Sequence, residues 1–261
     1  MFRHLFKKTA RIPGHEVAHY QFLRKLHLIR LNFRYRGFLR TLLGLMGYLF
    51  KKLKLPFFQS YLFNPAAEPE NGLDTSGIHE QRDLDIPEEK RSSATRYEAS
   101  SSFEFRYVLE RLRINYPDYH FIDYGSGKGA VLAVAARYPF ASVTGIELST
   151  SLHETACRNI EILERQGEVK AASLASFNED AGRYPLPDAP HIFYLYNPFA
   201  ADIMQKVLAR IRSDVTMRKS PSYLLYNNPM QHDTIAASGL FEKIAEPMGG
   251  AWHLYRMRPE H

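Results

Sequence analysis

The sequence predicts an α/β protein with a doubly wound, mostly parallel sheet of seven strands. Apolar segments typical of strands alternate with amphipathic segments typical of helices between residues 119 and 237. A glycine-rich turn joins the first strand to its helix, and two strands around Gly249-Gly250 close the chain. Such alternation favours parallel strands covered by helices on both faces, and the closing pair adds an antiparallel edge.

The expected elements follow one another along residues 96–258. A helix over 103–112, apolar at helical spacing, precedes the sheet. Strands are expected at 119–123, 141–147, 171–177, 191–196, 222–226, 241–246 and 252–257, of which 171–177 is the most poorly marked. Helices are expected at 128–138, 150–165, 201–213 and 230–237, and Ser149-Thr150 is placed to cap the second of these.

Three regions of the chain differ in charge and composition. Residues 1–60 carry thirteen Lys and Arg and one acid, Glu16, a net charge of +12, and the remainder carries −6. Residues 61–95 are rich in Pro, Gly, Glu and Asp and are expected to form a linker or a loop that wraps the domain. Residues 96–261 are expected to form the domain itself. The basic arm predicts an anionic partner, either a membrane surface or nucleic acid, with docking on the acidic domain as the alternative.

Nothing in the arm is expected to cross a membrane. The most apolar run, residues 38–50, would span roughly 20 Å as a helix, whereas a bilayer core needs about 30 Å. It is expected either to lie on a membrane surface or to pack against the domain. The single cysteine, Cys157, excludes an internal disulfide framework and favours the cytoplasm, with the arm at the inner membrane face as a further expectation.

The glycine-rich turn, residues 123–129, predicts a nucleotide-type pocket. Glycines let the backbone turn sharply, and the helix that follows is expected to offer free N–H groups to a polar or anionic ligand. Gly125, Gly127 and Ala130 fit the dinucleotide fingerprint. Asp123 argues against it, because a carboxylate repels a pyrophosphate and attracts a cationic or amino-acid ligand.

Two further acids are expected at the same edge of the sheet. Glu147 ends the second strand, where a carboxylate can accept hydrogen bonds from both hydroxyls of a ribose. Asp180, followed by Ala181, comes after the third strand and can accept from an adenine amino group. The alternative for Asp180 is a turn cap in a proline-rich loop.

In the order and spacing of these residues, the chain resembles the class I S-adenosylmethionine-dependent methyltransferases. The resemblance rests on residues 123–129, 145–147, 180–181 and 196–199 and covers residues 96–258. It implies a sheet in the order 3-2-1-4-5-7-6 with the last strand antiparallel. It also implies S-adenosyl-L-methionine as cofactor, with its methionine moiety held by Asp123 and by a loop containing Gly125, Ser126, Gly127 and Gly129. The ribose would lie at Glu147, and the adenine at Asp180 and Ala181.

The end of the fourth strand, Asn197-Pro198-Phe199, is the expected place of the chemistry. The Asn197 amide oxygen can accept a hydrogen bond from a substrate amine, Pro198 fixes the turn, and Phe199 can exclude water or contact the sulfonium. The motif is similar to that of amino-group methyltransferases but has one proline fewer. Residues 227–229 end the fifth strand and are expected to face the same edge.

The pattern is also similar to the Dot1-like lysine methyltransferases and related bacterial proteins. Here the similarity includes Arg96-Tyr97-Glu98. It implies that Tyr97 and Glu98 belong to a loop folded over the cofactor, with a helix-preceding loop as the alternative.

The expected function is methyl transfer to the nitrogen of a protein side chain or small-molecule amine. A non-catalytic cofactor-binding protein anchored by its arm is the first alternative, and an NAD-type oxidoreductase is the second. No metal is expected, since His153 and His191 lack partners at metal-binding spacing. Lys128, followed by Gly129, does not match a phosphate-binding loop.

Overall fold

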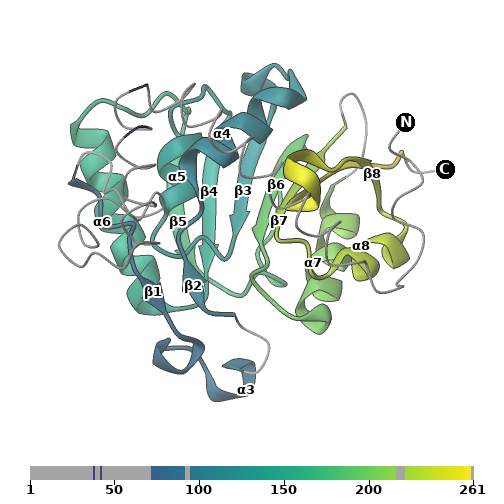
Figure 1. Cartoon of the computed structure of the whole chain (residues 1–261), viewed down its shortest axis with the longest axis horizontal. Coiled ribbons are helices and arrows are strands. Elements are labelled where there is room, and N and C mark those ends of the chain that lie inside the picture. The colour runs from purple at the N-terminus through teal and green to yellow at the C-terminus, as the bar shows by residue number, and fades with distance from the viewer. Residues whose placement is uncertain (1–37, 39–41, 43–71, 92–94, 216–220, 260–261) are drawn as a thin grey trace.

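The chain folds around a seven-stranded sheet with helices on both faces (Figure 1). The computed structural model describes residues 38, 42, 72–91, 95–215 and 221–259, and for Phe103 only the backbone. The strands of the sheet are β3 (His120–Tyr124), β4 (Ser142–Glu147), β5 (Leu174–Asn178), β6 (His191–Tyr196), β7 (Tyr223–Asn227), β8 (Phe241–Ala245) and β9 (Trp252–Met257).

The order of the strands in space confirms the predicted fold class. It is β5-β4-β3-β6-β7-β9-β8, which is 3-2-1-4-5-7-6 when the strands of the sheet are numbered along the chain. β3, β4, β5, β6 and β7 pair in parallel, and β9 runs antiparallel to both of its neighbours. In this order the polypeptide reverses direction of travel across the sheet between β3 and β6, and ligands bind at such a switch point, beyond the carboxyl ends of the strands.

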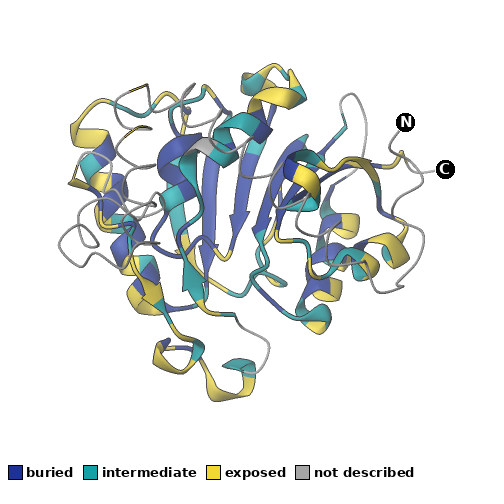
Figure 2. Cartoon of the chain, viewed as in Figure 1, coloured by how far each residue is buried: buried dark blue, intermediate teal, exposed yellow. Residues whose placement is uncertain are grey.

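Helices cover the two faces of the sheet unequally. α4 (Ser102–Leu109), α5 (Ala130–Ala135) and α6 (Thr150–Arg165) lie over one face, where Phe105, Phe121 and Tyr194 belong to the same buried cluster. α7 (Ala201–Asp214) and α8 (His232–Ser238) cover the other face. The central strands are buried almost throughout (Figure 2). Their alternating side chains enter one cluster or the other, which is why these segments are apolar on both sides.

A small antiparallel pair, absent from the sequence expectations, precedes the main sheet. β1 (Ile78–His79) pairs with β2 (Tyr97–Glu98), and α3 (Glu88–Arg91) lies between them in the chain. Residues 72–91 fold back onto the domain, since Lys128 Nζ lies 2.9 Å from Asp74 Oδ1 and Asn159 bonds the Asp74 backbone at 2.9 Å. The segment that was expected to be a linker or wrapping loop therefore packs on the domain over these residues.

The predicted bounds differ from the structure at two informative places. α5 begins at Ala130, because Gly129 has a left-handed backbone (φ 80°) that ends the turn rather than starting the helix. β5 begins at Leu174 rather than residue 171, and Ala171 is instead buried in the cluster beneath α5. The helix at 150–165 and the strands at 191–196 and 252–257 match their predictions residue for residue.

The basic arm and its apolar run lie outside the described residues, apart from the helical, exposed Phe38 and Leu42. Among the described residues, no helix combines the length and apolar character that a membrane span requires.

Candidate functional site

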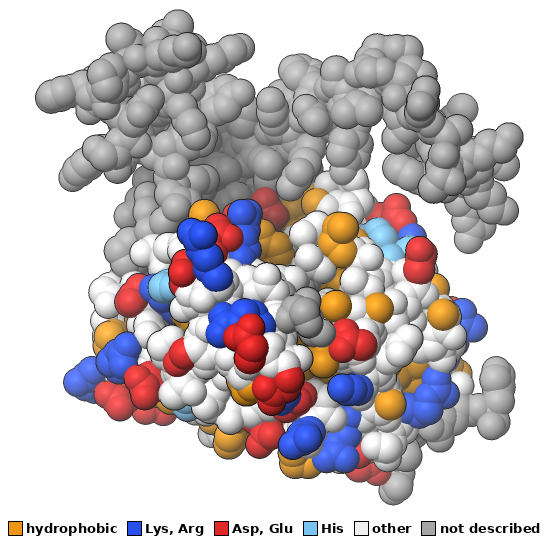
Figure 3. Space-filling view, turned by 90° about the horizontal axis from the view of Figure 1, so that it is seen from below, with side chains coloured by type: hydrophobic (Ala, Val, Ile, Leu, Met, Phe, Trp, Pro, Cys, Tyr) orange, Lys and Arg blue, Asp and Glu red, His pale blue; other side chains and the backbone are white. Residues whose placement is uncertain are grey.

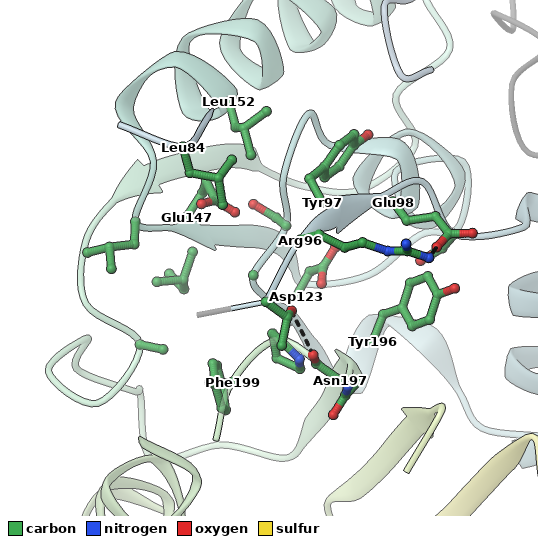
Figure 4. Close-up of a pocket in the computed structure, with 18 of the residues that line it drawn as sticks. Leu84, Arg96, Tyr97, Glu98, Asp123, Glu147, Leu152, Tyr196, Asn197 and Phe199 are labelled. Atoms are coloured by element: carbon green, nitrogen blue, oxygen red, sulfur yellow. Dashed lines mark hydrogen bonds and ion pairs between the residues drawn. The ribbon is translucent and has the colours of Figure 1, made fainter. Parts of the chain in front are cut away.

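A pocket of about 220 Å³ opens at the carboxyl ends of β3, β4 and β6. Figure 3 views the molecule from this side, where acidic and basic side chains are interspersed. The close-up shows two ends with Asp123 between them (Figure 4). Leu84, Glu147 and Leu152 lie at one end, and Glu98, Tyr196 and Asn197 at the other. We call these the Glu147 end and the Asn197 end.

Two glycines of the turn at residues 123–129 are required by close packing rather than by a ligand. A Cβ on Gly125 (φ 75°) would lie 2.6 Å from Pro198 Cβ, and one on Gly127 (φ 54°) would lie 2.2 Å from the Tyr97 ring. The turn is therefore packed between the end of β6 and β2, and no side chain larger than hydrogen fits at either position.

The amide groups of this turn are already hydrogen-bonded within the protein, whereas the free N–H groups that were expected belong to the helix that follows the turn, α5. Gly125 and Ser126 donate to Ile146 O at 2.8 and 3.2 Å, and Gly129 donates to Ser126 O at 2.9 Å. Gly127 donates to Glu147 Oε2 at 2.8 Å, and the Lys128 amide bonds the Tyr97 hydroxyl. With these five amides engaged, the turn presents side chains rather than backbone donors to the pocket.

Asp123 is the buried charge at the centre of the pocket. It is the next-to-last residue of β3, with only 2% of its surface exposed, and no described residue donates a hydrogen bond to its carboxylate. Burial, and secondarily the charge of Glu147, raise the pKa of Asp123 well above its ordinary value. A buried carboxylate in this state is a strong partner for a cation, because pairing removes most of the cost of its ionisation.

Glu147 is equally buried but is held by the backbone. Its two oxygens accept from Gly127 N and Ser149 N, each at 2.8 Å. Burial raises the pKa of Glu147, and these backbone donors oppose the rise. Each carboxylate oxygen can accept more than one hydrogen bond, so Glu147 keeps capacity for a pair of hydroxyls.

Asp180 lines the same end of the pocket, together with Ala181, but is already paired. Its Oδ2 lies 2.6 Å from Lys90 Nζ, and its Oδ1 accepts from Gly182 N at 2.8 Å. Although burial alone would raise it, the Lys90 and Gly182 donors leave the pKa of Asp180 below its ordinary value. Asp180 therefore caps the turn that contains Gly182, which was the alternative prediction, and it also lines the pocket.

The Asn197 end is built on a strained turn. Asn197 follows β6 with a left-handed backbone (φ 41°), which is uncommon for a residue with a side chain. Its carbonyl accepts from Thr95 Oγ1 at 2.9 Å, and its side-chain Oδ1 lies 3.5 Å from the Tyr226 hydroxyl. Backbone strain of this kind persists only where surrounding contacts maintain it. Here the contacts with Thr95 and Tyr226 keep Asn197 in the pocket wall. Pro198 and the buried Phe199 continue that wall.

Tyr97 and Glu98 belong to different parts of the pocket. Tyr97 packs on Gly127 and donates to Thr75 O at 2.8 Å, so it clamps the glycine turn. Glu98 pairs with Arg96 at 2.9 Å and lies beside Tyr196 (Figure 4). Glu98 therefore stands at the Asn197 end, away from Glu147.

Sequence reasoning missed the contribution of residues 84–90. Leu84 and Ile86 form a buried cluster with Leu152 and line the Glu147 end. Between them, Asp85 accepts from Ser151 N at 2.9 Å at the start of α6. The apolar pair Leu84 and Ile86, separated by Asp85 within an otherwise polar segment, could have predicted that this segment packs on the domain.

Most of the remaining candidates have packing or capping roles. Ser149 caps α6 as predicted, accepting from Leu152 N at 3.4 Å. His153 bonds Ser176 Oγ at 2.9 Å, and His191 bonds Ala189 O at 2.6 Å. Asn228 lines the pocket, next to the Asn197 end. Among the described residues, no group of His, Cys, Asp and Glu is arranged to hold a metal ion.

Comparisons with known proteins give similarity at the level of solved structures. No protein-family model and no curated protein matches the chain. A ribosomal protein L11 methylase from Lactobacillus delbrueckii subsp. bulgaricus is 15% identical, with a TM-score of 0.44, over 61% of this chain and 79% of that one. Magnesium protoporphyrin IX methyltransferase from Synechocystis PCC 6803 is 13% identical, with a TM-score of 0.45, over the same shares.

A third structure, mitomycin 7-O-methyltransferase, is 15% identical with a TM-score of 0.43, over 61% of this chain and 55% of that one. For two further matched structures, the alignment covers only 53% and 42% of the length of the matched chain. Because similarity of this strength transfers no activity, the function must be argued from the site.

Proposed function

We propose that this protein is an S-adenosyl-L-methionine-dependent methyltransferase that methylates a nitrogen atom. The observation that carries the proposal is Asp123, a buried carboxylate to which no described residue donates a hydrogen bond, set between two chemically different pocket ends. The cofactor is a cationic amino-acid nucleoside, and each of its parts has a counterpart in this pocket.

The residues present fit the cofactor part by part. Asp123 would hold the ammonium of the methionine moiety, and Glu147 would accept from the ribose hydroxyls. The apolar side chains of Leu84, Ile86 and Leu152 would pack on the base, next to Asp180. When bound there, the cofactor supplies an electrophilic methyl group on a sulfonium.

The Asn197 end would receive the methyl acceptor. The Asn197 amide oxygen can accept from an amine N–H, which would direct the nitrogen lone pair toward the methyl group. Productive transfer requires an approach of about 3 Å with aligned orbitals, so the fixed backbone of Asn197 and the buried Phe199 serve positioning and exclusion of water. The acceptor is an amine of a protein side chain or of a small molecule.

The same geometry disfavours a dinucleotide. Asp123 and Glu147 are two buried carboxylates beside the turn where a pyrophosphate would bind, and the turn amides that would cradle it are engaged. An anion placed there would meet repulsion from both carboxylates, and the engaged amides of the turn would not offset it.

A binding experiment separates the candidates. Isothermal titration should detect S-adenosylhomocysteine binding to the full chain and none of NADH, and Glu147→Ala should abolish the former. NADH binding without S-adenosylhomocysteine binding would refute the proposal. Transfer of a radiolabelled methyl group to fractionated lysate, reduced by about tenfold or more in Asn197→Ala, tests catalysis. Binding without transfer to any fraction would favour the non-catalytic alternative.

The basic arm suggests a second proposal, anchoring at an anionic membrane surface or nucleic acid. Its support is the charge of +12 over residues 1–60. Binding of the full chain to vesicles containing anionic lipid should weaken with salt, since surface charges are screened over about 8 Å at physiological ionic strength. Equal binding to neutral vesicles would contradict it.

A further inference from the structure

The Glu147 end carries a feature that the proposed function does not use, the ion pair between Lys90 and Asp180. Lys90 belongs to the short helix α3, ninety residues before its partner in the chain. Its Nζ lies 2.6 Å from Asp180 Oδ2, and the two side chains keep 27% and 16% of their surface exposed. Both residues line the pocket, so each contributes part of its surface to it.

The position of Lys90 is fixed by its neighbour Arg91. The Arg91 guanidinium bonds the Glu88 carboxylate at 2.9 Å and gathers backbone carbonyl groups of the same loop. At distances of 3.1 to 3.4 Å it donates to the carbonyls of Gln81, Arg82, Leu84 and Ile86. One side chain thus folds residues 81–91 into a compact loop.

The loop is also anchored to the domain on its other side. Asp85 accepts from Ser151 N at 2.9 Å and bonds the Ser149 hydroxyl, which holds it at the start of α6. Leu84 and Ile86 are buried against Leu152. Anchored at α6 and at Asp180, the loop forms a wall of the Glu147 end and presents Lys90 at a defined place.

The Lys90–Asp180 pair offers a donor and an acceptor side by side. An ammonium has three donors, of which one is used on Asp180, and each carboxylate oxygen can accept a second bond. An adenine edge offers the complement, an N6 amino donor next to a ring-nitrogen acceptor, which is N7 on one edge and N1 on the other. Hypoxanthine replaces that amino donor with a carbonyl acceptor, which would face the Asp180 carboxylate.

We propose that Lys90 and Asp180 together read the base, Asp180 accepting from the adenine N6 amino group and Lys90 donating to the adjacent ring nitrogen. This inference rests on the proposed function and makes Lys90 a specificity-determining residue of the cofactor site. Asp180, which the sequence suggested as the sole polar contact of the adenine, becomes half of a bidentate contact.

Base analogues of S-adenosylhomocysteine test the contact directly. Binding of the parent compound and of its 7-deaza, 1-deaza and inosine analogues would be measured by titration calorimetry on the full chain and on Lys90→Met. Wild type should bind one deaza analogue and the inosine analogue about tenfold or more weakly, because a hydrogen bond to a charged group is lost. Lys90→Met should bind the parent about tenfold more weakly and no longer distinguish that deaza analogue from it.

The control is Arg82→Met, a cation on the same loop whose side chain is 85% exposed, which should keep wild-type affinity for every analogue. A melting curve of each variant separates loss of contact from loss of fold. The inference is overturned if Lys90→Met binds the parent as wild type does. It is also overturned if the variant's affinity for the parent and for every analogue falls by the same factor, which is expected if Lys90 only supports the loop. Failure of the wild-type chain to bind S-adenosylhomocysteine would instead overturn the proposed function.

Discussion

The two ends of the pocket are constructed differently. At the Glu147 end, the carboxylates of Glu147 and Asp180 each accept two hydrogen bonds or ion pairs from the protein itself. At the Asn197 end, the polar groups are a strained Asn197 and an Arg96–Glu98 pair that is about half exposed. Asp123 lies between them, buried, and within the described part of the chain no group donates a hydrogen bond to it.

This difference indicates which part of a ligand each end can select. Groups that are already paired and buried are preorganised, so the Glu147 end suits a ligand that is the same in every turnover. Half-exposed groups tolerate variation, so the Asn197 end suits the variable acceptor. The central Asp123 lowers the folding stability of the ligand-free protein, because burying an uncompensated carboxylate is unfavourable. The same carboxylate increases the affinity for a cationic ligand.

The largest expected effect belongs to Asp123→Asn, which keeps the shape of the side chain and removes its charge. Affinity for S-adenosylhomocysteine should fall by about 100-fold or more, the cost of deleting one partner of a buried charge pair. The ligand-free variant should melt at a higher temperature than wild type. Titration calorimetry and thermal denaturation check the two effects, and a variant with wild-type affinity would show that Asp123 does not hold the ligand ammonium.

Gly127→Ala tests whether the turn between the two ends is fixed by packing. Its Cβ would lie 2.2 Å from the Tyr97 ring at a left-handed backbone position, so unfolding free energy should fall by about 2 to 4 kcal/mol. Gly167→Ala is the matched control, because its φ of 68° is similar but nothing lies within 4 Å, and it should cost only about 1 kcal/mol. Equal losses in urea denaturation would show that packing against Tyr97 contributes nothing.

Asn197→Ala should affect the other end alone. We expect kcat to fall by about tenfold or more through loss of the acceptor hydrogen bond, with cofactor affinity within about twofold of wild type. Steady-state kinetics with titration calorimetry separate the two. Weakened cofactor binding with unchanged kcat would mean that the two ends are assigned the wrong way round.

The smallest effect is a pH dependence set by Asp123. The pKa of Asp123 is raised in the folded, ligand-free protein, so the folded state holds more protons than the unfolded state just above the ordinary carboxyl value. Its contribution to stability is therefore present at low pH and lost as pH rises through the raised value. A cationic ligand favours the ionised form, so affinity should rise over the same window, by at most about tenfold per pH unit. Asp123→Asn should lack this slope, and a parallel slope in the variant would assign it elsewhere.

Much of this organisation could be predicted from the sequence, and the exceptions have physical causes. The strand order was an expectation from the family resemblance, and the structure confirms it. The places of Asp123, Glu147 and Asn197 followed from their positions near strand ends, because parallel strands bring their carboxyl ends to one edge. The occupied amides of the turn could not be predicted, since Tyr97 and Glu147 reach them only in the folded protein. Lys90 was hidden for the same reason, being ninety residues from Asp180 in a segment without strong periodicity.

A crystal structure of the chain with S-adenosylhomocysteine would test the central claim most directly. We expect the ligand ammonium at Asp123, the ribose hydroxyls at Glu147 and the base between Leu84 and Leu152 beside Lys90 and Asp180, with the sulfur facing Asn197. A ligand bound in the reverse direction, or outside this pocket, would contradict it.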